Sequence, residues 1–177
     1  MMIENPNQHK ASAEFTQAVI SRLATEKGVH AETALSAAAR MAGTFALRSC
    51  GLPLFRFMPG TSILGDVIDE QGQKVLRTVD ETLAGMSVRL DPQKLDCDLP
   101  EGNQPRMTLA EVQSVMDAAF RTIAEKYTLS NEEAAHAVAM STADLIQKCS
   151  GVLDPHLGYT IAVYGMVEAS KTVPFVM

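Results

Sequence analysis

The chain has 177 residues and a net charge of −6, and its lysines and arginines are scattered rather than clustered. Binding of nucleic acids and docking on anionic membranes both need concentrated positive charge, so the sequence predicts neither partner. With 46% hydrophobic and 20% charged residues, the composition is that of an ordinary globular protein.

The cysteines and the N-terminus indicate the compartment. Cys50, Cys97 and Cys149 are widely spaced and form no CxxC pair, which is typical of reduced thiols in a cytoplasmic protein. The first residues lack the basic region followed by an apolar run that marks a signal peptide. No segment reaches the roughly 18 apolar residues of a membrane span. We therefore expect a cytoplasmic protein without a membrane segment.

Three helices are predicted in the first half of the chain. Apolar residues at three- and four-residue spacing predict a helix over 8–27, which Gly28 ends. Alanine, the best helix former, dominates 31–50 and predicts a buried central helix. A third helix is expected over 61–83, with an acidic outer face on which Glu70 pairs with Lys74 and Arg77 with Glu81.

Residues 86–107 form a predicted linker, because this segment is rich in proline and has no hydrophobic period. Three further helices follow it. Thr108 and Glu111 form a capping box that starts the fourth, and Ser130 and Glu133 form another that starts the fifth. Asp154 followed by proline starts the sixth helix, which is apolar nearly all round to residue 170 and is therefore expected to be central.

The two halves resemble each other. A shift of one hundred residues superimposes the first helical pair on the fourth and fifth helices, and the third and sixth helices share a spacing of Leu, Gly, Ile and Gly. The sequence thus predicts an all-α fold, a six-helix bundle of two similar three-helix repeats related by a pseudo-twofold axis. Its parts are 1–85, the linker 86–107 and 108–177, packed as one compact domain.

The glycines of this shared pattern allow two interpretations. They are Gly65 and Gly72 in the third helix, and Gly158 and Gly165 in the sixth. A glycine inside a helix lowers the stability of the helix by about 1 kcal/mol relative to alanine. We therefore expect each of these glycines to have a structural or functional role. Either the helices cross at short range, or the missing side chains leave room for a small apolar ligand.

A metal site is the main catalytic alternative. Glu133 and His136 have the Glu-x-x-His spacing of di-iron bundles, in which both side chains project from one helix face. Glu32 and His156 could complete a mononuclear site, but no second Glu-x-x-His occurs and Glu133 already has a capping role. Asp144 is expected at the surface, paired with Lys148. No cofactor is predicted.

Apolar residues also occur where a solvated loop is expected. The connection 52–60 and the C-terminus contain an unusual number of aromatic and apolar side chains for loops, namely Leu54, Phe55, Arg56, Phe57, Met58 and Phe175. Such a loop either covers the core or forms an interface, where aromatic residues, Met and Arg are enriched. The leading prediction is a non-enzymatic interaction or regulatory module that forms a homodimer through this segment. The alternatives are the apolar-ligand bundle and the metal-dependent enzyme.

Overall fold

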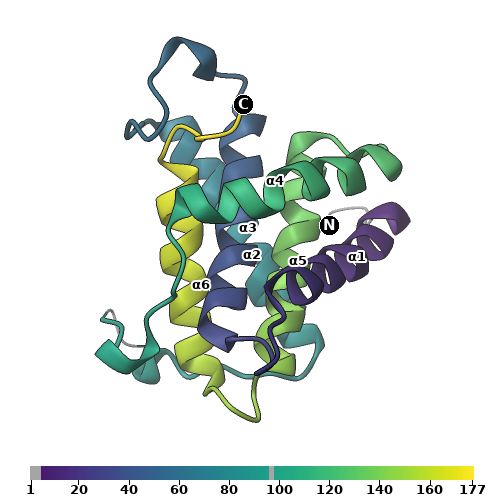
Figure 1. Cartoon of the computed structure of the whole chain (residues 1–177), viewed down its shortest axis with the longest axis vertical. Coiled ribbons are helices and arrows are strands. Elements are labelled where there is room, and N and C mark those ends of the chain that lie inside the picture. Colours follow the sequence, from purple (N-terminus) through teal and green to yellow (C-terminus); the bar gives the residue numbers. More distant parts are fainter. Residues whose placement is uncertain (1–4, 96–97) are drawn as a thin grey trace.

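The computed structural model describes residues 5–95 and 98–177. Within these ranges the chain has no β-strand, and only two isolated β-bridges occur. The fold is formed by six α-helices (Figure 1): α1 (Pro6–Leu23), α2 (Ala31–Ser49), α3 (Asp66–Gly85), α4 (Leu109–Lys126), α5 (Asn131–Lys148) and α6 (Pro155–Ser170). Short 3₁₀ turns lie in the connections, at Leu54–Arg56, Pro92–Lys94 and Glu101–Asn103. The prediction of an all-α fold is confirmed.

Two helices start at the capping boxes that the sequence predicts. The Thr108 hydroxyl accepts a hydrogen bond from the backbone N–H of Glu111 at 3.3 Å, and the Glu111 carboxylate accepts one from the backbone N–H of Thr108. Ser130 and Glu133 make the same exchange at the start of α5. These reciprocal bonds satisfy backbone N–H groups that the first turn leaves unpaired.

The start of α3 differs from the prediction. The helix begins at Asp66 rather than near residue 61, and Gly65 before it is extended. The preceding residues bond to the C-terminal segment instead: Val173 N donates to Thr61 O, and Ile63 N to Lys171 O, both at 2.8 Å. These tertiary hydrogen bonds replace the first turn of the expected helix, and the hydrophobic period of residues 61–65 does not reveal them.

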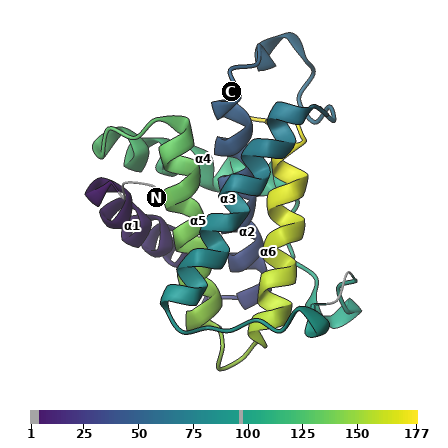
Figure 2. The ribbon, with the colours of Figure 1, turned by 180° about the vertical axis from the view of Figure 1, so that it is seen from behind.

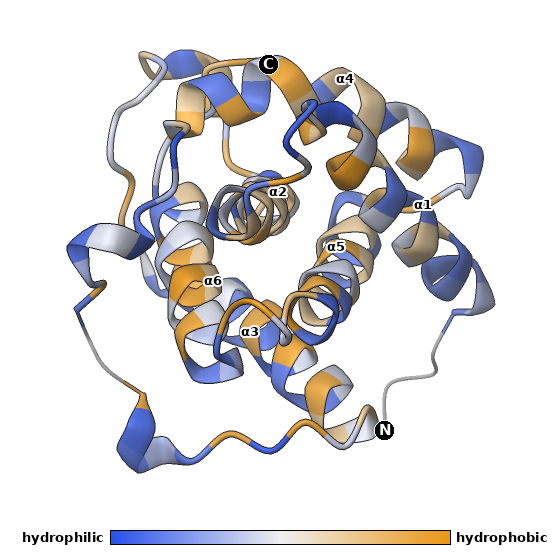
Figure 3. Cartoon of the chain, turned by 60° about the horizontal axis from the view of Figure 1, so that its bottom comes forward, coloured by the Kyte–Doolittle hydropathy of each residue, from blue (hydrophilic) through white to orange (hydrophobic). Residues whose placement is uncertain are grey.

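Helix α2 is the centre of the molecule, as predicted. Looking along its axis, the other helices surround it (Figure 3), and it packs most extensively against α6 and then α5. The prediction that α6 is central is wrong in part, because only one side of it is covered. Tyr164 and Val167 lie on its exposed side.

The two halves of the chain are interleaved. α1 packs mainly against α5, α2 against α6 and α5, and α3 against α5 (Figures 1 and 2). Each of the first three helices therefore has its main partners in the second half. None of the helices in the described ranges combines the length and the apolar character that crossing a membrane requires.

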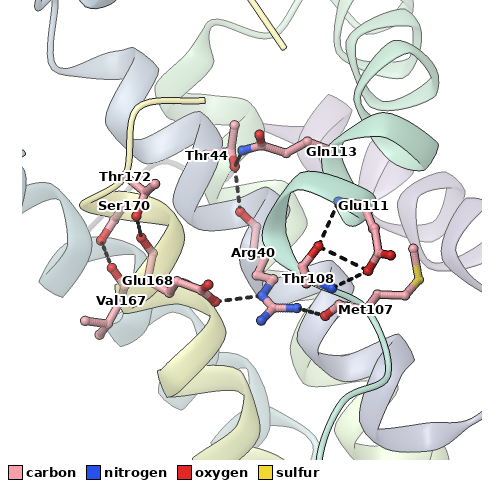
Figure 4. Close-up of polar contacts among 10 residues, drawn as sticks. All are labelled: Arg40, Thr44, Met107, Thr108, Glu111, Gln113, Val167, Glu168, Ser170 and Thr172. Carbon is pink, nitrogen blue, oxygen red and sulfur yellow. Dashed lines mark hydrogen bonds and ion pairs between the residues drawn. The ribbon is translucent and has the colours of Figure 1, made fainter. Parts of the chain in front are cut away.

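Polar contacts fix the linker and the C-terminal segment to the core (Figure 4). Arg40 Nε lies 2.8 Å from Glu168 Oε2, and Arg40 also donates to the backbone carbonyl of Met107. The buried amide of Gln113 donates to the Thr44 hydroxyl at 2.9 Å and accepts from the backbone N–H of Phe175 at 2.8 Å. These bonds hold both segments in place without a disulfide between the described cysteines.

Candidate functional site

A cavity of about 1010 Å³ lies between α3, α5 and the N-terminal end of α1. Helices α3 and α5 run side by side there (Figure 2). The volume is at the upper end of what small-molecule sites occupy, about 300–1,000 Å³. His136 from α5 and Thr78 from α3 line the cavity, and charged side chains from both helices surround them.

His136 is the most constrained side chain of the cavity. It lies three residues after the capping glutamate of α5, contacts Thr78 on α3, and is only 6% exposed. Its Nδ1 lies 2.6 Å from the hydroxyl of Thr78. Burial lowers the pKa of His136, and Lys74 acts in the same direction, while the carboxylates of Glu132 and Glu81 oppose the shift. The ring is therefore neutral at pH 7, and its Nε2 has no hydrogen-bond partner among the described residues.

The charges around the ring are only partly paired. The predicted pair of Lys74 and Glu70 is confirmed, with Nζ 3.1 Å from Oε1. The predicted pair of Arg77 and Glu81 is wrong, because no ion pair joins these side chains. Arg77, Glu81 and Glu132 are exposed and make no hydrogen bond or ion pair within the described part of the chain. Unpaired charges of both signs thus face one cavity.

The structure does not bring the four candidate metal ligands together. Glu133 lines the cavity with His136, but its oxygens accept hydrogen bonds from Ser130 N and from Asn5 Nδ2. His156 lies in the first turn of α6, where its Nε2 accepts from Asp91 N and its Nδ1 contacts the N-cap residue Asp154.

Glu32 lies elsewhere, beside His30 and Asn103. Across residues 5–95 and 98–177, no three His, Cys, Asp or Glu side chains form a group that could hold a metal ion.

The four candidate glycines have different surroundings. Gly158 and Gly165 face α2: a Cβ on Gly158 would lie 3.3 Å from Leu35 Cδ1, and one on Gly165 would lie 3.1 Å from Ser36 O. Both therefore serve close helix packing.

The other pair is less crowded. Gly65 precedes α3 and has open space beside it. Gly72 borders a hollow of about 360 Å³ between α3 and α6, and the closest atom to its added Cβ is Ser170 Oγ at 3.6 Å. Gly165 borders a different hollow, of about 490 Å³ between α2 and α6, so Gly72 and Gly165 do not line the same one.

The predicted interface residues lie at one end of the molecule. Leu54 is buried in a small cluster with Leu47 and Ile68, so it anchors the loop. The other predicted residues are exposed there, together with apolar neighbours at the start of α3 and at the C-terminus. We call this surface the apolar end: Leu52, Phe55, Phe57, Met58, Leu64, Val67, Phe175 and Met177. The connection between α2 and α3 lies beside the C-terminus at the top of Figure 1.

The two cysteines that the structure describes show no sign of a reactive thiol. Cys50 and Cys149 are unbridged and partly buried, while Cys97 lies outside the described residues. Burial raises the pKa of both described thiols, whereas a nucleophilic cysteine needs a lowered pKa.

Comparison with known protein families found no match for this chain. Curated protein sequences gave no match either, nor did solved structures. Any function must therefore be argued from the cavity and the apolar end themselves.

The protonation of His136 makes a testable contribution to stability. We expect the free energy of unfolding to fall as the pH is lowered from about 7.5 to about 5.5. The pKa of His136 is lowered in the folded protein, so the unfolded chain, with a pKa near 6.5, takes up the proton first. The neutral ring of His136 contributes its full stabilisation above a pH of about 6.5, the pKa in the unfolded chain. This contribution is lost as the pH falls through the lower pKa of the folded protein. Urea unfolding at several pH values measures it.

The control for this prediction is His136→Gln, which removes the titrating group and keeps a polar side chain. Its stability should depend less on pH over the same interval. The carboxyl groups of Glu14, Glu32 and Glu133 also have lowered pKa values, but they lose their contributions only as the pH falls below their ordinary value of 4.5. Equal slopes for the variant and the wild type would show that His136 is not the group responsible.

Proposed function

We propose that this protein is a non-enzymatic interaction module of the cytoplasm that works as a homodimer, with the apolar end as its interface. The observation that carries the proposal is the exposure of large apolar side chains there. Phe55 is 76% exposed, Met58 78% and Leu64 79%. Scattered apolar residues are normal on a protein surface, but a contiguous group of them indicates an interaction site.

The apolar end is held in place before any partner binds. Leu54 anchors the loop in the core, and Arg56 N and Phe57 N close the 3₁₀ turn through hydrogen bonds of 3.0 Å. The loop is also bonded to the C-terminal segment, since Gly60 N donates to Val173 O at 2.9 Å. A surface that is already ordered loses little conformational entropy on binding.

A second copy of the chain is the partner that best fits this surface. Residues 50–65 contain one charged side chain, Arg56, and no carboxylate, although the whole chain carries −6. The loops of two copies can therefore meet without bringing carboxylates together, and the first carboxylate after the loop is Asp66 at the start of α3. Arg56 lies over the Phe55 ring, with Cζ 5.8 Å from the ring centroid. Residues 51–67 and 173–177, 22 residues together, fall within the roughly 20 to 30 residues per side of a standard interface.

The proposal predicts that Phe55→Asp combined with Met58→Asp gives a folded monomer. Both side chains point into solvent, so the acids do not disturb the core, while a dimer interface would have to bury four unpaired carboxylates. Sedimentation equilibrium should show a wild-type dimer and a monomeric variant, with unchanged circular dichroism.

The matched control is Val152→Asp. Val152 is 84% exposed and lies in the α5–α6 connection, at the other end of the molecule. This variant should remain a dimer. A wild-type monomer at micromolar concentrations, or a double variant that stays dimeric, would contradict the proposal.

We further propose that the fold arose by duplication of a three-helix unit. The two copies, α1–α3 and α4–α6, would be related by a pseudo-twofold axis. The packing pattern supports it: α1 contacts α5 as α4 contacts α2, and α3 contacts α5 as α6 contacts α2. The likeness is limited at one point, because Gly158 lies inside α6 while Gly65 precedes α3.

A further inference from the structure

The proposed dimer makes no use of the cavity beside His136. Its chemistry differs from that of the apolar end, since it combines a neutral buried imidazole with charged side chains of both signs. The cavity therefore needs its own explanation, and that explanation does not depend on whether the chain dimerises.

The cations and anions are arranged in order along α3. Lys74 and Arg77 occupy one turn of the cavity wall, and Glu81 occupies the next, with Thr78 between them. One helical turn rises about 5.4 Å. The positive and negative parts of the wall are thus separated by a distance that a small molecule with two charged ends can span.

The opposite wall reinforces the negative part. Glu132 at the start of α5 lines the same cavity, and both it and Glu81 act electrostatically on the His136 ring. A carboxylate from each helix thus lines the same cavity as the ring. An ammonium group placed beside it would meet two carboxylates, neither of which has another partner in the described part of the chain.

The positive part is suited to a carboxylate. Arg77 has no partner within the described residues, and the guanidinium fork binds carboxylates through two parallel hydrogen bonds. Lys74 adds a second positive charge, which it shares with Glu70. Met140 and the aliphatic part of Thr82 supply apolar wall for the body of a ligand.

We propose that this cavity binds a small zwitterion of the amino-acid class. Its carboxylate lies against Arg77 and Lys74. Its ammonium lies between Glu81 and Glu132 and donates a hydrogen bond to Nε2 of His136. The neutral state of the imidazole suits this ligand, because a charged ring would repel the ammonium group.

Isothermal titration calorimetry on the full chain tests the proposal. The probes are the twenty L-amino acids and γ-aminobutyrate, each up to about 10 mM, with acetate and methylammonium as single-charge controls. We expect at least one zwitterion to bind, and both controls to bind at least about tenfold more weakly. Arg77→Met and Glu132→Gln should each weaken the zwitterion by about tenfold or more. Both side chains are exposed, so these variants should fold.

Matched controls remove the same charges elsewhere. Arg89→Met and Glu26→Gln change exposed side chains outside the cavity and should leave affinity unchanged. The proposal is overturned if none of the zwitterions binds, if acetate or methylammonium binds as tightly as they do, or if the cavity variants bind like the wild type.

Discussion

Replacing Gly43 with alanine is expected to lower the free energy of unfolding by about 2 to 3 kcal/mol. Gly43 lies inside α2, where it meets α6 more closely than any other described glycine does. A Cβ at this position would lie 2.4 Å from Met166 O, 2.9 Å from Ala169 Cβ and 2.9 Å from Ser170 N. Two of these are backbone atoms, which cannot rotate away, so the two helices must separate.

The matched control is Gly72→Ala, also inside a helix. The nearest atom to its added Cβ is Ser170 Oγ at 3.6 Å, an ordinary contact. Alanine is favoured over glycine in a helix by about 1 kcal/mol, so this variant should be as stable as the wild type or more stable. Urea unfolding followed by circular dichroism measures both. If Gly43→Ala proved as stable as Gly72→Ala, the close contact between α2 and α6 would not exist.

The sequence predicts the elements of this fold better than their packing. Hydrophobic period and capping residues give all six helices, and the starts of α4 and α5 follow from reciprocal bonds within one turn. The start of α3 was missed because residues 61–63 bond to residues 171–173, which are distant in sequence. Gly43 was missed for a similar reason. Nothing in the spacing of the alanine-rich α2 distinguishes Gly43 from its neighbours. The reason for a glycine there is the close approach of α6, which the sequence of α2 does not show.

The same holds for the candidate sites: the sequence predicts features within one segment but not the contacts between segments. The apolar loop could be recognised from composition alone, because nine residues hold two of the six phenylalanines. Its buried member, Leu54, could not be told apart from the exposed ones. At the cavity, the spacing of Glu133 and His136 predicts a shared site, but the partner of His136 is Thr78, on a different helix. A threonine among the apolar residues of α3 was the available signal.

A buried ion pair joins α2 to α4, and breaking it is expected to lower the stability of the protein strongly. Asp117 accepts a hydrogen bond from Arg48 Nη1 at 2.7 Å and forms an ion pair with Arg121 Nε at 2.8 Å, and its side chain is 3% exposed. Arg48 also donates through Nη2 to Val176 O at 2.8 Å, which ties the C-terminal segment to α2. Removing the carboxylate would leave the Arg48 guanidinium buried without a counter-charge.

Asp117→Asn is therefore expected to lower the free energy of unfolding by about 3 kcal/mol, because an uncompensated buried charge costs far more than a lost surface pair. The matched control is Asp144→Asn, whose Lys148 partner lies 3.3 Å away at the surface; this change should cost less than about 0.5 kcal/mol. Arg48→Met made in the Asp117→Asn background should cost much less than in the wild type, since the two side chains act as a pair. Strictly additive costs in this double-mutant cycle, measured by urea unfolding, would mean that Asp117 does not stabilise the buried charge of Arg48.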